Sequence, residues 1–594
     1  MNERRPSSRI GRKSHTEPGL EKAKTSGTAR VSGHAEAARG SAKQGSRRIE
    51  SRGGKVAKPS KPAQSPRSTQ ERLQGRSDEL RRKAKPSVEA TRQNAPTPKR
   101  SEWQGGSHHS KPRQPNGDPR PGRKMASTVA AAASAGGRPA EQLGVGDRIV
   151  VTIKRVGING EGVGYYRRKT VFIDGAIAGE VVKAQVVAVE PSYVKAELLE
   201  IEKQSSYRQQ PPCPVFDRCG GCQVQHIAYE GQLQAKEELV REAFRRYTGL
   251  NELPMKPIAG MEQPWGYRNK AQLQLQRANG GIVAGLYEAN SHALVDISDC
   301  SIQHPQVNEA VNTIKRIMDE LRIPLYREHK GKDGIRTLVV RYGFQSDELQ
   351  VTLVADGERI PRIDELVRKV HKALPQVIGI ALNVNAKKTS VIFGEHTRTL
   401  WGRETMKESL EALEFELSPR AFFQLNPVQT VKLYDSVRAA AALRGDEIVV
   451  DAYCGTGTIG LWLAPYVKEV HGIELIPEAV EDARRNAAHN GYDNVQFHVG
   501  RAEELLPRWA ATGMRPDVIV ADPPRTGLER QFIDTVLRVQ PKRFVYVSCN
   551  PSTLAKDCRV LIDGGYAIEW VQPVDVFPMT SHVENVALLV RGGV

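Results

Sequence analysis

Strands and helices alternate from Ile448 to the end of the chain, and this alternation restricts the possible folds strongly. Apolar runs of strand length, such as 448–453 and 518–521, are nearly continuous, and segments of helical periodicity lie between them. The helix expected at 477–490 has Pro477 in its first turn and ends at an Asn-Gly pair, which are typical start and stop signals. This pattern predicts an α/β fold of the Rossmann-like, doubly wound class.

The expected elements of this region can be given by their residue ranges. They are strand 448–453, helix 458–466, strand 469–473, helix 477–490, strand 495–498, strand 518–521, helix 529–538, strand 544–548 and helix 552–562, followed by two more strands.

Two further globular regions precede this sheet. Residues 142–203 contain short strands separated by glycine-rich turns, which predict a small five-stranded, OB-like β-barrel. Such barrels bind RNA or serve as packing modules, and these residues alone do not distinguish the two. Residues 204–400 have mixed α/β character with an amphipathic helix at 229–247, so we expect the sheet domain to occupy 401–594.

The first quarter of the chain has a different composition from the rest. Residues 1–140 hold 32 basic and 11 acidic side chains, whereas the whole chain of 594 residues has a net charge of +19. Residues 1–141 contain few branched apolar or aromatic residues, so we expect a disordered basic tail. The tail is interpreted as an arm that binds nucleic acid by counterion release, with a solubilising leader as the alternative.

Other features limit the compartment and the partners. No apolar run is long enough to span a membrane and no secretory signal is visible, so a cytoplasmic protein without membrane association is expected. The sequence gives no sign of an obligate protein partner. Its seven cysteines are few and odd in number, which favours metal-binding or catalytic thiols over a disulfide framework.

A glycine-rich segment marks a nucleotide-type binding site. The sequence Gly455-Thr-Gly-Thr-Ile-Gly460 follows a predicted strand and opens a helix, and Glu474 lies at the end of the next strand. The glycines permit close approach of a ligand, while the carboxylate can accept hydrogen bonds from ribose hydroxyls. This pattern fits either a nicotinamide dinucleotide or S-adenosylmethionine.

Three later segments place reactive groups at the same edge of the sheet. Asp522-Pro-Pro-Arg525 follows one strand, and Cys549 follows the next, just before a helix whose N-terminal dipole is expected to favour the thiolate. Glu584 lies near the end of the chain. Because ligands of open α/β sheets bind at the carboxyl ends of strands, these groups are expected to face one crevice.

These segments resemble the signatures of one enzyme family, the S-adenosylmethionine-dependent RNA uracil-5-methyltransferases. The matching motifs are Asp-Pro-Pro-Arg-x-Gly, Tyr-x-Ser-Cys-Asn-x-x-Thr, Phe-Pro-x-Thr-x-His-x-Glu and the upstream Phe-Phe-Gln-Leu-Asn, at residues 522–527, 546–553, 577–584 and 422–426. The resemblance extends over about residues 142–594, and it identifies the barrel at 142–203 with the RNA-binding TRAM domain of many members.

The resemblance implies a role for individual residues. It makes Cys549 the nucleophile and Glu584 the general base, with S-adenosylmethionine as the cofactor. The residues that it places on the cofactor are Gln424, Tyr453, Glu474 and Asp522, with Glu474 on the ribose and Asp522 near the adenine or the substrate crevice.

Four other cysteines form a separate motif. Cys213, Cys219 and Cys222 are close in sequence, and Cys300 follows at a distance. Four thiolates hold either a [4Fe-4S] cluster or a tetrahedral zinc ion, and the spacing alone does not decide between them. The spacing resembles the [4Fe-4S] motif of the ribosomal-RNA branch of the family, which implies 23S ribosomal RNA as the substrate.

The implied reaction begins with thiolate addition to carbon 6 of uracil, because carbon 5 is otherwise too weak a nucleophile. A uridine within a stem must leave its stack first, so a loop or a flipped base is expected. Three alternatives remain: a transfer-RNA uracil-5 enzyme, an RNA cytosine-5 enzyme, and a nonenzymatic RNA-binding assembly factor. The cytosine enzymes generally pair two cysteines at strand ends, whereas no cysteine adjoins Asp522-Pro-Pro-Arg525.

Overall fold

The computed structural model describes residues 143–278, 280–288, 291, 293–326 and 333–592. The predicted basic tail, 1–141, lies outside the described residues. Within the described part of the chain, no helix combines the length and the apolar character needed to cross a membrane.

The first described region is a closed barrel of five strands, as predicted. Its strands follow the order β1-β2-β3-β5-β4. Buried residues alternate with exposed ones along β1, and the inward-facing valines, isoleucines and alanines form a core of their own. The strands are β1 (Arg148–Val156), β2 (Gly162–Tyr166), β3 (Lys169–Ile173), β4 (Val181–Val189) and β5 (Tyr193–Lys203).

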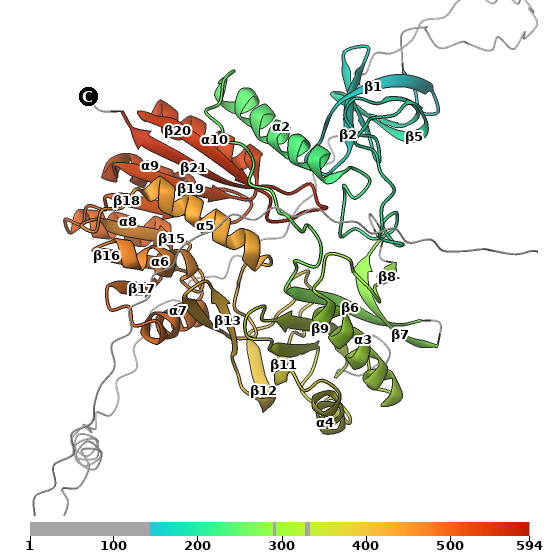
Figure 1. Ribbon diagram of the computed structural model, residues 1–594, viewed down its shortest axis with the longest axis vertical. Coiled ribbons are helices and arrows are strands. Elements are labelled where there is room, and N and C mark those ends of the chain that lie inside the picture. Colours follow the sequence, from blue (N-terminus) through green and yellow to red (C-terminus); the bar gives the residue numbers. More distant parts are fainter. Residues whose placement is uncertain (1–142, 279, 289–290, 292, 327–332, 593–594) are drawn as a thin grey trace, which may run out of the picture. The chain divides into compact units, whose positions relative to one another are not determined.

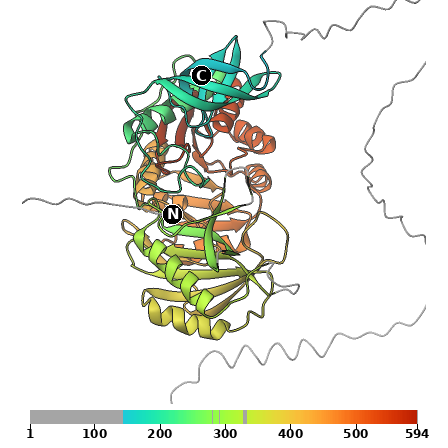
Figure 2. The ribbon, with the colours of Figure 1, turned by 90° about the vertical axis from the view of Figure 1, so that its right-hand side faces the viewer.

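The central region is built on a seven-stranded sheet with the order β12-β11-β10-β9-β6-β7-β8. Helices α3 (Pro305–Glu320) and α4 (Ile363–Ala373) pack their apolar residues on one face of it (Figure 2). The last strand continues to Gly402, two residues past the predicted domain boundary. The strands are β6 (Lys270–Ala278), β7 (Gly281–Tyr287), β8 (Leu294–Asp296), β9 (Ile335–Tyr342), β10 (Leu349–Ala355), β11 (Val377–Val384) and β12 (His396–Gly402).

The C-terminal region contains a second seven-stranded sheet with the order β17-β16-β15-β18-β19-β21-β20. Its first five strands are parallel, and β21 runs antiparallel between β19 and β20. A hairpin of β13 (Met406–Leu410) and β14 (Leu413–Leu417) precedes it. The sheet strands are β15 (Ile448–Ala452), β16 (Glu469–Glu474), β17 (Val495–Val499), β18 (Val518–Ala521), β19 (Arg543–Ser548), β20 (Tyr566–Val574) and β21 (Glu584–Arg591).

Helices cover both faces of this sheet, which confirms the doubly wound prediction (Figure 1). One face packs against α5 (Pro427–Ala441), α6 (Thr458–Leu463) and α7 (Pro477–His489). The other packs against α8 (Ala502–Ala511), α9 (Arg530–Val539), α10 (Pro551–Asp563) and α2 (Tyr229–Thr248). Helix α8 was not expected from the sequence, and it accommodates a proline in its interior. The expected helix 458–466 is α6 followed by a 3-10 turn, Ala464–Tyr466.

Helix α2 belongs to the core of the C-terminal sheet although it precedes the central sheet in sequence. Its residues Val240, Ala243 and Phe244 are buried with residues of α9 and α10. On the same helix, Lys236 is buried and its ammonium lies 2.5 Å from a carboxylate oxygen of Asp575, which is also buried. This ion pair fixes the start of the segment 575–583 that leads to Glu584.

Several elements hold the rest of segment 575–583. The carbonyl of Met579 accepts hydrogen bonds from the backbone N–H groups of Gln223 and Val224, each at 3.2 Å. The Ser581 hydroxyl donates to the carbonyl of Ile158 in the barrel at 2.8 Å. The segment is therefore fixed by residues far from it in sequence, including the barrel and the cysteine-containing loop.

Candidate active site

Four of the predicted site residues, Tyr453, Glu474, Asp522 and Cys549, lie at the carboxyl ends of parallel strands. Glu584 begins the antiparallel β21, and Gln424 lies in the segment before α5. Strands β15 and β18 are neighbours in the sheet, and the chain after β15 leaves in the direction of β16 on the other side. This reversal of strand order is the position at which open α/β sheets bind ligands. The Asp522 N–H donates to the carbonyl of Ala452 at 3.3 Å, so the loops after the two strands begin side by side.

The glycine-rich loop leaves space for a ligand. Gly455 and Gly457 have φ values of 56° and 79°, in the left-handed region that glycine adopts readily. A Cβ on Gly455 would meet nothing within 4 Å, whereas one on Gly457 would come within 2.5 Å of the Phe497 ring. Gly455 is thus open toward the crevice, and Gly457 permits close packing beneath it.

Glu474 is held in a fixed orientation beside this loop. Its carboxylate accepts hydrogen bonds from the N–H of Gly455 at 3.1 Å and from the N–H of Ile476 at 2.9 Å. Two bonds leave further acceptor capacity on the carboxylate, since each oxygen has two lone pairs. Glu474 can therefore receive hydroxyl donors from a ligand that lies over Gly455.

A neighbouring carboxylate was not singled out from the sequence. Asp451 is buried in β15, and one of its oxygens accepts from the N–H of Gly460 at 2.8 Å. Its other oxygen, Oδ1, is buried without a hydrogen-bond partner. Burial raises the pKa of Asp451 to about 8. A buried acceptor of this kind fits a polar or cationic donor from a bound ligand.

Cys549 and Glu584 approach each other across an antiparallel strand pair. Ser548 of β19 pairs with Asn585 of β21, Cys549 follows Ser548 just beyond the strand, and Glu584 precedes Asn585, so the two side chains lie close enough to interact electrostatically. Burial raises the pKa of the Glu584 carboxyl to about 8, and the nearby carboxylate of Asp522 contributes in the same direction. Burial also raises the pKa of Asp522 to about 7.

The electrostatics of Cys549 differ from the prediction. The N-terminus of α10 was expected to favour the thiolate. Instead, burial, together with the carboxylates of Glu584 and Asp522, raises the pKa of the Cys549 thiol to about 11. Desolvation disfavours the charged thiolate and is the largest of these causes.

Arg525 supplies the cation nearest to this thiol. Its charge and its hydrogen bond to Cys549 lower the pKa of the thiol. Its Nη2 also lies 2.9 Å from Nε2 of His582, and burial lowers the pKa of His582 to about 4, so the imidazole is neutral at pH 7. The carbonyl of Arg525 accepts from the Asn550 side chain at 3.3 Å and from the Thr553 hydroxyl at 3.4 Å. Both Arg525 and His582 lie within the recognised motifs, but sequence reasoning gave neither a role.

Gln424 and Tyr453 belong to two segments that are held by different contacts. The segment that carries Gln424 is joined to the glycine-rich loop, because the Thr456 hydroxyl donates to the carbonyl of Phe422 at 3.2 Å. Tyr453 has a φ of 64°, and its hydroxyl donates to Glu503 of α8 at 2.5 Å. Its ring packs against Phe532, 5.6 Å between centroids. Glu503 is a polar residue of this region that the sequence did not indicate.

The four cysteines of the separate motif come together away from this crevice. Cys213, Cys219, Cys222 and Cys300 line one cavity of about 60 Å³. Burial raises the pKa of Cys222 to about 12 and raises the pKa of Cys300, whose sulfur accepts backbone hydrogen bonds. The Gly221 N–H donates to the Cys219 sulfur at 3.4 Å. In the described residues, no three His, Cys, Asp or Glu side chains are arranged to hold a single metal ion.

Comparison with known proteins identifies the family. The profile of the tRNA (uracil-5-)-methyltransferase family matches residues 228–592, and that of the TRAM domain matches residues 142–199. The chain belongs to the tRNA (uracil-5-)-methyltransferase family. The resemblance seen in the sequence is therefore confirmed, as is the barrel as a TRAM domain.

Individual relatives agree with this membership. The chain is 52% identical to an uncharacterised RNA methyltransferase of Halalkalibacterium halodurans over 450 residues, 75% of this chain and 97% of that protein. It is 51% identical to an uncharacterised RNA methyltransferase of Bacillus cereus, over 76% and 98% of the two chains. Among solved structures, it is similar to the Pyrococcus abyssi tRNA (uracil-54, C5)-methyltransferase in complex with S-adenosyl-L-homocysteine. That similarity has a TM-score of 0.59 and 27% identity, and it covers 74% of this chain and 100% of the other.

Proposed function

We propose that this protein transfers a methyl group from S-adenosylmethionine to carbon 5 of a uridine in 23S ribosomal RNA, through a covalent bond between Cys549 and carbon 6. The observation that carries the proposal is the position of Cys549, just past the carboxyl end of β19, beside Glu584, the first residue of the antiparallel β21. A thiol and a carboxylate that lie this close together suit a reaction in which the thiolate adds to carbon 6 of uracil and the carboxylate removes a proton from the adjacent carbon 5.

The cofactor is assigned to the crevice over the glycine-rich loop. The open space above Gly455, the oriented carboxylate of Glu474 and the unpartnered Oδ1 of Asp451 fit a ligand with ribose hydroxyls and a cationic donor. S-adenosylmethionine, when bound, supplies an electrophilic methyl group. Gln424, Tyr453 and Asp522 would border it, as the family resemblance implies.

The chain's own residues carry the remaining steps. Cys549 must lose its proton before it adds to carbon 6, and Arg525 stabilises the resulting thiolate. Addition makes carbon 5 an enolate carbon, which takes the methyl group. Glu584 then removes the proton from carbon 5, and the electron pair of that C–H bond expels the thiolate. A pKa of about 8 suits Glu584 to this task, because a general base works best with a pKa close to the working pH.

We assign a [4Fe-4S] cluster to Cys213, Cys219, Cys222 and Cys300. All four line one cavity, and backbone N–H groups donate to the sulfurs of Cys219 and Cys300, as they commonly do around iron–sulfur clusters. Each cysteine of such a cluster binds a separate iron, so the four sulfurs stand farther apart than around one zinc ion. The cluster would tie the loop 213–222 to the start of α3 and take no part in methyl transfer.

The substrate is tested by mapping 5-methyluridine in RNA from a strain that lacks this gene. Loss of a site in 23S ribosomal RNA, restored by the wild-type gene and not by a Cys549→Ala variant, is the expected result. Loss confined to transfer RNA would favour the second candidate, a transfer-RNA enzyme, which the similarity to the Pyrococcus abyssi protein supports. Unchanged 5-methyluridine in both RNAs would overturn the proposed function.

A further inference from the structure

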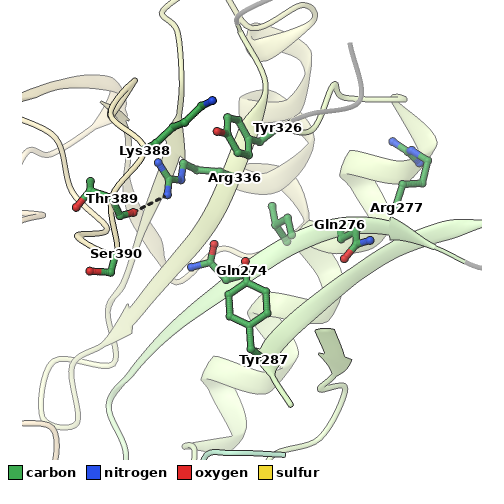
Figure 3. Close-up of a pocket in the computed structure, with 10 residues that line it drawn as sticks. Gln274, Gln276, Arg277, Tyr287, Tyr326, Arg336, Lys388, Thr389 and Ser390 are labelled. Atoms are coloured by element: carbon green, nitrogen blue, oxygen red, sulfur yellow. Dashed lines mark hydrogen bonds between the residues drawn. The ribbon is translucent and has the colours of Figure 1, made fainter. Parts of the chain in front are cut away.

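The central sheet carries a recess that the proposed catalytic residues do not line. It has a volume of about 880 Å³ and lies between β6, β7 and the loop that joins β11 to β12 (Figure 3). The lining residues that matter here are amides, aromatic rings and cations: Gln274, Gln276, Tyr287, Tyr326, Arg336 and Lys388.

The amides come from a strict alternation along β6. Its sequence runs Gln-Leu-Gln-Leu-Gln from residue 272 to residue 276. Because successive side chains of a strand point to opposite faces, Leu273 and Leu275 enter the core, while the glutamines share the other face. The Gln274 carbonyl oxygen accepts from the Thr337 hydroxyl at 3.2 Å, and its NH₂ group has no partner among the described residues. The recess therefore offers hydrogen-bonding groups on a rigid strand.

Among the described residues, no carboxylate forms an ion pair with Arg336 or Lys388 of the recess. The Arg336 guanidinium donates to backbone carbonyls, including those of Lys387 at 3.1 Å and Thr389 at 3.3 Å, and it lies over the Tyr326 ring. The Lys388 ammonium forms no ion pair or hydrogen bond with a described residue, and the described residues that line the recess include no carboxylate. An anionic group would be attracted to this wall of the recess.

An exposed aromatic ring completes the lining. Tyr287 is 49% exposed at the end of β7. Figure 3 shows it on the side of the recess opposite Arg336 and Lys388, with Gln274 between them. A ring for stacking, amides for a base edge and cations for a phosphate together match one unpaired nucleotide of RNA.

The recess is linked to the active site by the strand that lines it. Just before β6, the Asn269 side chain donates to the carbonyl of Gln424 at 3.0 Å, and its N–H donates to the carbonyl of Leu425 at 3.0 Å. Gln274 and Gln276 follow five and seven residues later, which is roughly 15–25 Å along an extended strand. One nucleotide cannot reach both places, but one RNA strand can.

We propose that this recess binds an unpaired nucleotide of the substrate RNA at a distance from the reacting uridine, and so sets which RNA strands are methylated efficiently. The inference rests on the proposed function for the identity of its ligand. The Tyr287 ring stacks on the base, the amides of β6 contact its edge, and Lys388 binds a phosphate.

The test measures RNA binding by the full chain with fluorescence anisotropy. The probe is a mixed-sequence single-stranded RNA of roughly 30 nucleotides, longer than the site of one small binding domain. Tyr287→Ala should weaken binding about tenfold through lost stacking, and Tyr287→Phe should keep it. Lys388→Ala should lower the slope of log affinity against log salt by about 0.7, the value for one phosphate contact on a single strand.

Lys387→Ala is the matched control. Lys387 adjoins Lys388 but pairs with Glu395 at 2.8 Å and does not line the recess, so affinity, salt slope and methylation should stay at wild-type values. With methylated RNA as the readout, the effects of the recess variants should appear in KM. For a trinucleotide substrate, the recess variants should have the KM of the wild-type protein, because a trinucleotide is too short to reach from the active site to the recess.

Two results would overturn the proposal. Wild-type RNA affinity and salt slope in both Tyr287→Ala and Lys388→Ala would show that RNA does not enter the recess. Binding of free AMP or UMP as tight as that of the RNA, lost in Tyr287→Ala, would make the recess a mononucleotide site instead. These binding measurements need no turnover, so they decide the question even if wild-type protein fails to methylate uridine.

Discussion

Ser548 and Asn585 stand directly opposite each other in the β19–β21 pair, and the Asn585 side-chain amide donates to the Ser548 carbonyl at 3.2 Å. Cys549 follows Ser548 directly beyond the end of β19, and Glu584 precedes Asn585 as the first residue of β21. The spacing between the proposed nucleophile and the proposed base is thus set by backbone pairing in the sheet rather than by a flexible loop.

Cys549→Ala and Glu584→Gln should stop the reaction at different points. Without the thiol, neither methylation nor a protein–RNA adduct should form. Without the carboxylate, addition and methylation proceed, but the carbon-5 proton stays and the adduct accumulates. Denaturing gel electrophoresis separates the adduct from free protein. RNA containing 5-fluorouridine should trap the wild-type protein in the same way, and a failure to do so would contradict the covalent mechanism.

The pKa of Cys549 should respond to its charged neighbours in opposite directions. Glu584→Gln removes a carboxylate that raises this pKa, so adduct formation with 5-fluorouridine RNA should extend to lower pH. Arg525→Gln removes a cation that lowers it, so adduct formation should need higher pH. The measurement is the initial rate of adduct formation against pH. Identical profiles for the two variants would rule out electrostatic control of this thiol.

Turnover should fall as the pH decreases through about 8. Glu584 acts as a base only when ionised, and its raised pKa means that a growing fraction is protonated below that pH. The Cys549 thiol ionises still higher, so both groups make turnover rise with pH. The profile of kcat/KM between pH 6 and pH 9 checks this expectation. A flat profile over that range would show that neither group limits the reaction.

Lys236→Met should destabilise the fold strongly. It leaves the buried Asp575 carboxylate without its cation, which typically costs about 3–5 kcal/mol. The midpoint of urea unfolding should fall accordingly, and Lys236→Met with Asp575→Asn should recover part of the loss. Lys183→Met, which breaks an exposed pair with Glu200, is the control and should leave the midpoint nearly unchanged. Equal midpoints for Lys236→Met and Lys183→Met would contradict the assigned role of the buried pair.

Protein purified without oxygen should be brown and contain iron. Four thiolates complete the ligand set of a [4Fe-4S] cluster without Cys549, so Cys222→Ser should lose the colour, while Cys558→Ser, at a buried cysteine of α10, should keep it. Absorption spectra and metal analysis provide the readout. Stoichiometric zinc in colourless protein would refute the cluster assignment.

Local sequence patterns determined much of this fold. The apolar runs and their turn signals predict the doubly wound sheet and the five-stranded barrel, because each pattern reflects which face of an element is buried. Helix α8 was missed, and it contains Pro507, a residue that normally interrupts helices. The sequence predicted Glu474, Asp522 and Cys549 at strand ends, and the order of strands brings those ends together.

Only the tertiary structure decided how these residues behave. The sequence predicted a lowered pKa for Cys549 from the nearby helix, but burial and two carboxylates raise it, and both are consequences of long-range packing. The partnership of Arg525 with His582, the burial of Lys236 against Asp575 and the recess beside Tyr287 likewise join residues that are far apart in sequence. A sequence pattern specifies which local element forms. Water is excluded from a side chain, and charged groups from distant segments come close to it, only once those elements have packed together.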